Sequence, residues 1–297
     1  EFIGHCSNLQ VWYEHDYDSR LLHRNLAFPL LKQLTEIGDH LAKRAFREEI
    51  AKRLNSGYPS VVNYLIEEKY IDYLGRDELL FNLLIHEEAE VIRELEQLSN
   101  IKFEKSIQFE ILYDFEEYKR NSIVIKNKHV IRLDMYKVNL RQFPEIITQL
   151  SYLKELFLRK LRLKSISENI GELNSLERVD FSYNIIEKLP DSIRNLQNLK
   201  KLYLENNRLY FLPQALGDLK NLQELNIIDN KISTIPETFI GLLSLEELWM
   251  RGNYFEKFPV VLENLKNLKY LSLSVENVPK VPPKMENNKN LSIRFYS

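Results

Sequence analysis

Few reactive side chains in this sequence have the spacing that catalysis or metal binding requires. His86 and Glu90 lie four residues apart in a helical pattern, so one helix face would present both, as it would two metal ligands. A catalytic zinc helix has a second histidine at this spacing, which is missing here, so we interpret the pair as part of a solvated face. We interpret His15, Asp16 and Asp18 in the same way, as a charged entry to a helix, and we expect no metal site.

Motifs for nucleotide binding and nucleophilic catalysis are missing as well. The chain has eight glycines, and none belongs to a G-x-x-x-x-G-K, G-x-G-x-x-G or G-x-S-x-G pattern. Without these patterns the backbone cannot form the familiar phosphate cradles or the strained serine turn of many hydrolases. We therefore expect that the protein is not an enzyme, that it has no catalytic residues and that it binds no cofactor.

Composition limits the kinds of partner and the compartment. The length of 297 residues is enough for two domains, and the net charge of −2 does not suit a nucleic-acid partner. No run of about 18 apolar residues is present, so we expect no membrane insertion. The single cysteine, Cys6, cannot form an internal disulfide, which predicts a cytoplasmic, reducing location.

The residues best suited to binding recur at fixed positions of an internal repeat. Apolar residues that begin a unit are always 23 residues apart, at Val130, Leu153, Leu176, Leu199, Leu222, Leu245, Leu268 and Leu291. The fifth position of the units carries the rings Phe157, Tyr203 and Trp249, with polar residues such as Asn226 between them. The seventh position includes Arg159, Glu205 and Arg251. Trp, Tyr and Arg are types in which binding energy concentrates, so we predict that these seven residues bind a partner.

A short strand must position these side chains. Leu202 and Leu204 alternate with polar residues at the period of a strand, so they should point inward while Tyr203 points outward. Asn207 follows where the chain turns away, and its amide can bond to backbone groups that the turn leaves unpaired. We predict a buried structural ladder of Asn184, Asn207, Asn230 and Asn253.

The pattern L-x-x-L-x-L-x-x-N-x-L, with "LP" after the turn as in Leu189-Pro190 and Leu212-Pro213, resembles leucine-rich repeats. It is similar to the intracellular repeats of Ras-group-related and Roco-like proteins and to many prokaryotic repeat proteins. The resemblance implies an α/β solenoid, a horseshoe with a parallel sheet on its concave face. It comprises seven repeats from residue 130 and a truncated eighth at residue 291, in which Arg294 would replace an inward leucine.

The chain outside the repeats divides into three parts. Residues 122–135 alternate around Asn127 and Lys128 and predict a hairpin that caps the repeat domain of residues 122–297. Residues 101–121 are rich in aromatic residues and predict a packed connector. Residues 1–100 predict an α-helical module that loosely resembles armadillo or HEAT pairs. In this module Asp39 would begin a helix whose apolar stripe is Ala42, Phe46, Ile50 and Leu54.

A basic cluster lies in the first two repeats. It comprises Arg132, Lys137, Arg141, Arg159, Lys160, Arg162 and Lys164. One interpretation is a well-solvated edge, and the other is an electropositive rim that steers an acidic partner surface.

Two functions fit the sequence. The first is an intracellular scaffold for protein–protein interaction that binds a protein partner on the concave face, and the aromatic residues favour it. The second is a regulatory or substrate-recognition part of a larger GTPase-linked or ligase protein, whose catalytic domain lies outside residues 1–297. The resemblance and the missing initiator Met favour this second hypothesis. A small GTPase is one candidate partner, and the sequence predicts no oligomeric state.

Overall fold

The computed structural model describes residues 9–18, 24–103, 107–109, 121–274 and 281–296. The chain forms two compact units, residues 1–89 and 90–297. The division falls within helix α6 (His86–Ser99), before the boundary that we expected at residue 100.

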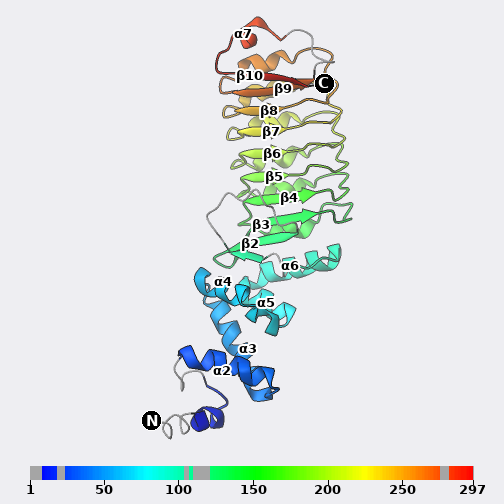
Figure 1. Cartoon of the computed structure of the whole chain (residues 1–297). Coiled ribbons are helices and arrows are strands. Elements are labelled where there is room, and N and C mark those ends of the chain that lie inside the picture. The colour runs from blue at the N-terminus through cyan, green and yellow to red at the C-terminus, as the bar shows by residue number, and fades with distance from the viewer. Residues whose placement is uncertain (1–8, 19–23, 104–106, 110–120, 275–280, 297) are drawn as a thin grey trace. The chain divides into compact units, whose positions relative to one another are not determined.

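The first unit is all-α, as the sequence predicts. Its elements are α2 (Arg24–Glu36), α3 (His40–Asn55), α4 (Pro59–Glu67), the 3-10 helix η1 (Tyr70–Tyr73) and α5 (Arg76–Leu83) (Figure 1). Asp39 caps α3, because its carboxylate accepts a hydrogen bond of 2.9 Å from the backbone N–H of Ala42. The apolar stripe of α3 is buried, and it packs Phe46 against Phe28 and Tyr70, with ring centroids 5.0 and 5.9 Å away. Edge-to-face and tilted ring contacts of this kind stabilise small helical cores.

The second unit contains one ten-stranded sheet in which the strands follow chain order. Its strands are β1 (Ile107–Phe109), β2 (Ser122–Lys126), β3 (His129–Tyr136), β4 (Glu155–Arg159), β5 (Arg178–Asp180), β6 (Lys201–Tyr203), β7 (Glu224–Asn226), β8 (Glu247–Trp249), β9 (Tyr270–Ser274) and β10 (Ser292–Tyr296). All neighbours pair in parallel except β2 and β3, which form an antiparallel hairpin. From β3 to β9 the register pairs each residue with the one 23 positions later, so equivalent repeat positions form straight columns across the sheet.

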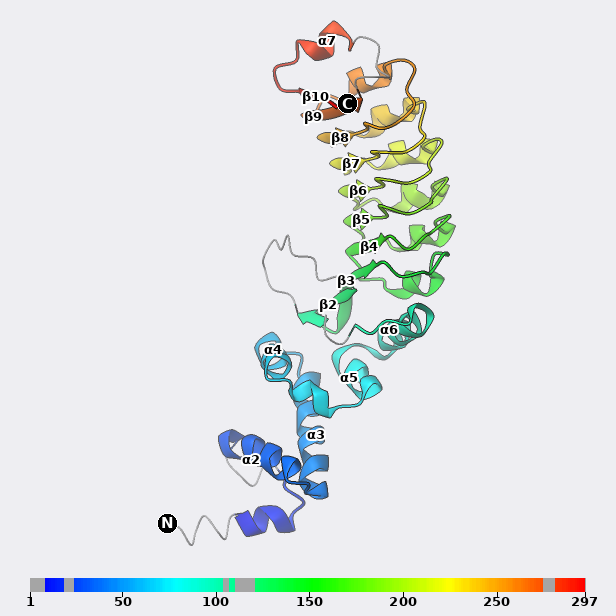
Figure 2. The same ribbon diagram turned by 45° about the vertical axis from the view of Figure 1, so that its right-hand side comes forward.

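Short 3-10 helices form the opposite side of this solenoid (Figure 2). They are η3 (Glu145–Gln149), η4 (Glu168–Glu172), η5 (Asp191–Asn195), η6 (Gln214–Asp218), η7 (Glu237–Gly241) and η8 (Val260–Asn264), and a short helix α7 (Pro283–Glu286) follows. The repeat leucines fill the space between these helices and the sheet and are almost completely buried. The helices stack closely, because a Cβ on Gly217 would lie 2.2 Å from the carbonyl oxygen of Thr238.

The N-terminal edge of the sheet extends further than we expected. The hairpin of β2 and β3 turns at Asn127 and Lys128, but β1 pairs with β2 and is the outermost strand of the described chain. β1 comes from the segment that we interpreted as a packed connector. Residues 104–106 and 110–120 of that segment lie outside the described residues.

The expected register of the last strand is wrong. Arg294 of β10 pairs with Ser272 of β9, one position away from the 23-residue spacing. Because side chains alternate between the faces of a strand, this shift places Arg294 on the concave face and Ile293 and Phe295 on the opposite side of β10, where Phe295 is 52% exposed. The shift avoids the burial of a guanidinium in the apolar core, which would be costly.

Candidate partner-binding face

The concave face is built from the third, fifth and seventh positions of the repeats, which point away from the core. The fourth and sixth positions, such as Leu202 and Leu204, are fully buried, and this burial fixes the direction of their neighbours. The columns place all seven predicted binding residues on this face, but in different surroundings.

Phe157 is not the exposed ring that we expected, because its side chain is only 1% exposed. Three guanidinium groups lie over the ring: the Cζ atoms of Arg132, Arg178 and Arg159 are 4.6, 5.2 and 5.4 Å from its centroid. An arginine can stack on an aromatic face and shield it from water. Phe157 is therefore a buried ring beneath polar groups, and its role as a binding anchor remains a prediction.

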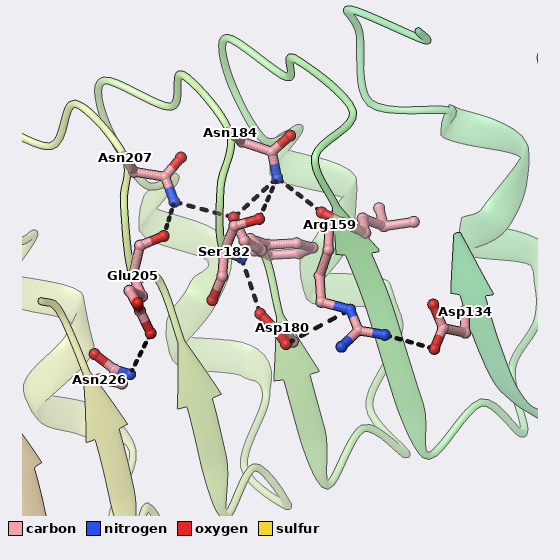
Figure 3. A network of polar contacts seen from close by, with 10 residues as sticks. Asp134, Arg159, Asp180, Ser182, Asn184, Glu205, Asn207 and Asn226 are labelled. Carbon is pink, nitrogen blue, oxygen red and sulfur yellow. Dashed lines mark hydrogen bonds and ion pairs between the residues drawn. The ribbon is translucent and has the colours of Figure 1, made fainter. Parts of the chain in front are cut away.

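Arg159 was expected to be a surface charge that steers a partner, but it forms ion pairs within the domain. Its Nη2 atom lies 2.7 Å from Oδ2 of Asp134, and its Nε atom lies 3.8 Å from Oδ2 of Asp180 (Figure 3). Burial raises the pKa of both carboxyl groups, although Arg159 favours their charged forms. The guanidinium therefore compensates two carboxylates that have lost much of their hydration.

The middle of the concave face is a network of polar contacts. The hydroxyl of Tyr203 donates a hydrogen bond to the carboxylate of Glu224. The carboxylate of Glu205 accepts a hydrogen bond of 2.8 Å from the Tyr183 hydroxyl. It also accepts one of 3.3 Å from the Asn226 amide (Figure 3). These contacts hold the predicted binding residues Tyr203, Glu205 and Asn226 in defined orientations.

The C-terminal repeats bring together a cluster of aromatic side chains. The rings of Trp249 and Tyr270 pack with their centroids 5.8 Å apart. The Tyr270 hydroxyl lies 2.9 Å from that of Tyr296, and the Arg251 guanidinium lies 5.1 Å from the centroid of the Tyr296 ring. The predicted residues Trp249 and Arg251 are therefore neighbours of two tyrosines that our repeat analysis did not select.

Sequence reasoning missed Tyr270 because it followed only the fifth and seventh positions. The third position also faces outward, and it reads Arg132, Glu155, Arg178, Lys201, Glu224, Glu247 and Tyr270 along the sheet. Along the sheet this column changes from mainly basic to acidic and then to aromatic residues. This trend can be read from the sequence and would have indicated Tyr270. Tyr296 could not be assigned to this face without the register shift of β10.

The asparagines of the ninth position are buried, each less than a tenth exposed. In Asn207, Oδ1 accepts a hydrogen bond of 3.1 Å from the N–H of Ile186, and Nδ2 donates to the carbonyl groups of Phe181 and Leu204 at 3.0 and 3.1 Å. Asn184, Asn230 and Asn253 make equivalent contacts. Each amide thus satisfies backbone groups of two neighbouring repeats, which keeps the strands that carry the concave face in register.

The basic cluster of the first repeats divides into two groups. Arg132 pairs with Glu155 at 3.2 Å, and it lies with Arg159 on the concave face. The other members are exposed residues of the loops that follow β3 and β4: Lys137, Arg141, Lys160, Arg162 and Lys164. Their role as an electropositive rim remains a prediction.

Other kinds of site have little support in the described chain. Within it, no group of three or more His, Cys, Asp and Glu side chains could hold a metal ion. Its helices are all too short or too polar to cross a membrane.

Comparison with known families identifies the repeats. Residues 211–255 match one family model described as "Leucine rich repeat", and residues 175–196 and 198–219 match a second model of the same description. No curated protein matches the chain significantly.

Solved structures of similar proteins include three of different origin. A leucine-rich repeat protein of Leptospira interrogans is 30% identical, with a TM-score of 0.48, over 55% of this chain and 41% of its own. Internalin C2 of Listeria monocytogenes is 24% identical, with a TM-score of 0.50, over 56% of this chain and 71% of its own. The plant peptide hormone receptor RGFR1, solved in complex with RGF2, is 29% identical, with a TM-score of 0.46, over 52% of this chain and 26% of its own.

The matches to the family models agree with the geometry of the second unit. The present chain spans less than half the length of the Leptospira protein, and internalin C2 supports the fold alone. The family models, the 23-residue register of the sheet and the stacked 3-10 helices all point to one architecture. The second unit of this chain is therefore a leucine-rich repeat domain.

Proposed function

We propose that the protein is a non-enzymatic, cytoplasmic interaction protein that binds a protein partner on the C-terminal half of its concave face. Leucine-rich repeat domains generally mediate protein–protein interaction, which supports the class of function. The observation that carries the choice of surface is the ring pair of Trp249 and Tyr270, flanked by Arg251. Both rings are only partly buried, and these residue types concentrate binding energy in interfaces.

The N-terminal half of the concave face is less suited to supply the main anchors. Phe157 is already buried, and Arg132 and Arg159 already pair with Glu155 and Asp134. A partner that bound there would have to break these ion pairs, or bind a surface whose charges are already paired. We expect this half to contribute to specificity, while Trp249 contributes most of the affinity.

Affinity capture and calorimetry test the proposal. The full chain and its Trp249→Ala variant serve as baits in parallel, and the variant should lose the partner. Titration of the identified partner should then show a loss of about 2 kcal/mol, roughly thirtyfold in Kd. Gln214→Ala, on the exposed 3-10 side, is the control and should bind normally. Full affinity of Trp249→Ala for the captured partner would place the binding site elsewhere.

A further inference from the structure

We propose that Glu247 and Trp249 form a receptor for one arginine side chain of the partner protein. This inference rests on the proposed function, because it assigns a chemical group to the partner at the same face. It is carried by an internal comparison between two repeats of this chain. One repeat already contains the complete arrangement, and the other lacks its cation.

The complete arrangement lies at β3 and β4. Glu155 and Phe157 occupy the third and fifth positions of one repeat, and the guanidinium of Arg132 reaches both. Its Nη1 atom lies 3.2 Å from Oε2 of Glu155, and its Cζ atom lies 4.6 Å from the centroid of the Phe157 ring. The planar cation is thus held by a carboxylate and an aromatic face together, which is a favourable environment for a guanidinium.

The incomplete arrangement lies at β8. Glu247 and Trp249 occupy the same two positions, but the residues that pair with Glu247 on the neighbouring strands are Glu224 and Tyr270. Neither supplies a cation. Of the repeats, only those of Glu155 and Glu247 combine a glutamate at the third position with an aromatic residue at the fifth.

The nearby lysines, Lys201 and Lys269, favour the charged form of Glu247 only in part, because each forms its ion pair with another glutamate. Lys201 pairs with Glu224 at 2.8 Å, and Lys269 pairs with Glu246 at 2.7 Å. Arg251 lies over the ring of Tyr296. In the part of the chain that the structure describes, no Lys or Arg forms an ion pair with Glu247.

Two further observations favour a missing ligand group. Partial burial and the neighbouring Glu224 raise the pKa of Glu247, so its charge is destabilised as the structure stands. In addition, the hydroxyl of Ser272, the register partner of Trp249, is fully buried and has no hydrogen-bond partner among the residues that the structure describes. The guanidinium of arginine has five hydrogen-bond donors and a flat face that can stack on a ring, whereas the ammonium group of lysine has no flat face. Among aromatic side chains, the indole of tryptophan attracts a cation most strongly. These properties select arginine over lysine.

The test uses a blocked peptide, acetyl-Gly-Arg-Gly-amide, as the probe and the full chain as the receptor. The chain has two tryptophans, and Trp12 is buried in the helical unit, so the indole N–H signal of Trp249 is easily assigned by NMR. The same peptides with citrulline or lysine in place of arginine are the ligand controls. Glu247→Gln is the test variant, and Glu246→Gln, whose carboxylate pairs with Lys269, is the matched control.

The arginine peptide should shift the Trp249 signal saturably, and the citrulline peptide should bind at least about fivefold more weakly. Glu247→Gln should weaken the arginine peptide by a similar factor, and Glu246→Gln should not. Tyr270→Arg, which places a guanidinium opposite Glu247 as Arg178 lies opposite Glu155, should abolish the response. Equal binding of the arginine and citrulline peptides, or an unchanged response in Glu247→Gln, would overturn the proposal. The proposed function is tested independently of the arginine receptor. If Trp249→Ala loses the partner and Glu247→Gln retains it, the binding face is supported and the arginine receptor is not.

Discussion

The guanidinium of Arg159 lies 2.7 Å from the carboxylate of Asp134, which is fully shielded from solvent. Removal of one member of a buried ion pair leaves the other charged without compensation, and this is much more costly than the loss of an exposed pair. We therefore predict that Arg159→Ala lowers the free energy of unfolding by about 3 kcal/mol. Urea denaturation followed by circular dichroism measures this change.

An exposed pair in the same domain provides the control. Arg194 and Asp218 lie 3.3 Å apart, with both side chains about half exposed. Arg194→Ala should change stability by less than about 1 kcal/mol. Similar losses in Arg194→Ala and Arg159→Ala would show that Arg159 is an ordinary surface charge, as the sequence alone suggested.

The asparagine ladder gives a second prediction about stability. Asn207→Leu keeps the branched shape of the side chain but leaves the N–H of Ile186 and the carbonyl of Phe181 without their amide partner. Buried backbone groups without partners cost about 1–3 kcal/mol, so the melting temperature should fall. Asn221 is exposed and bonds to the carbonyl of Gln197, and Asn221→Leu should have little effect. An unchanged melt for Asn207→Leu would contradict the role of the ladder.

The sequence was sufficient wherever the structure depends on local pattern. The 23-residue spacing of leucines predicted the repeats, because every unit repeats the same inward positions. Asp39 could be recognised as a helix cap because an N-cap depends only on the next three residues. The order and direction of the main strands followed from the repeat itself.

The surroundings of the outward side chains depend on neighbouring strands and were harder to predict. The burial of Phe157 requires Arg132 from β3 and Arg178 from β5, neither of which belongs to its own repeat. The register of β10 was missed because the spacing was extended to Leu291 without asking which register keeps Arg294 out of the core. The sequence contained that signal, since Ile293 and Phe295 alternate with polar residues.

Phe157 is buried and Trp249 is only partly buried, so we predict that the first ring matters for stability and the second for binding. Phe157→Ala should lower the free energy of unfolding by about 3 kcal/mol, because it opens a cavity beneath three guanidinium groups. Trp249 is only partly buried, so Trp249→Ala should stay within about 1 kcal/mol of the parent while it loses the partner. Chemical denaturation of both variants measures the difference. A larger loss of stability in Trp249→Ala would mean that this ring is chiefly structural.

Two glutamates of the repeat domain should respond to pH in opposite directions. Partial burial and then Glu224 raise the pKa of Glu247 above its ordinary value of 4.5, so the folded state prefers the protonated carboxyl. Hydrogen bonds from Lys200 and Lys154 lower the pKa of Glu177, so the folded state prefers the carboxylate. Glu247 therefore opposes folding at neutral pH, whereas Glu177 supports it.

Replacement of each residue by glutamine should reveal these signs. At pH 7, Glu247→Gln should raise the melting temperature, and the gain should disappear as the pH falls below about 4.5, where the carboxyl is protonated in both states. Glu177→Gln should lower the melting temperature at pH 7, and this loss should disappear only as the pH falls through the lowered pKa of the folded state. Each effect should remain below about 1 kcal/mol, because water screens both groups. Calorimetric melts of the two variants and the parent between pH 3 and pH 8 measure them, with the range chosen around the ordinary carboxyl pKa. A loss of stability in Glu247→Gln at pH 7 would mean that a cation within the chain already compensates Glu247, which would also remove the basis for an arginine receptor at β8.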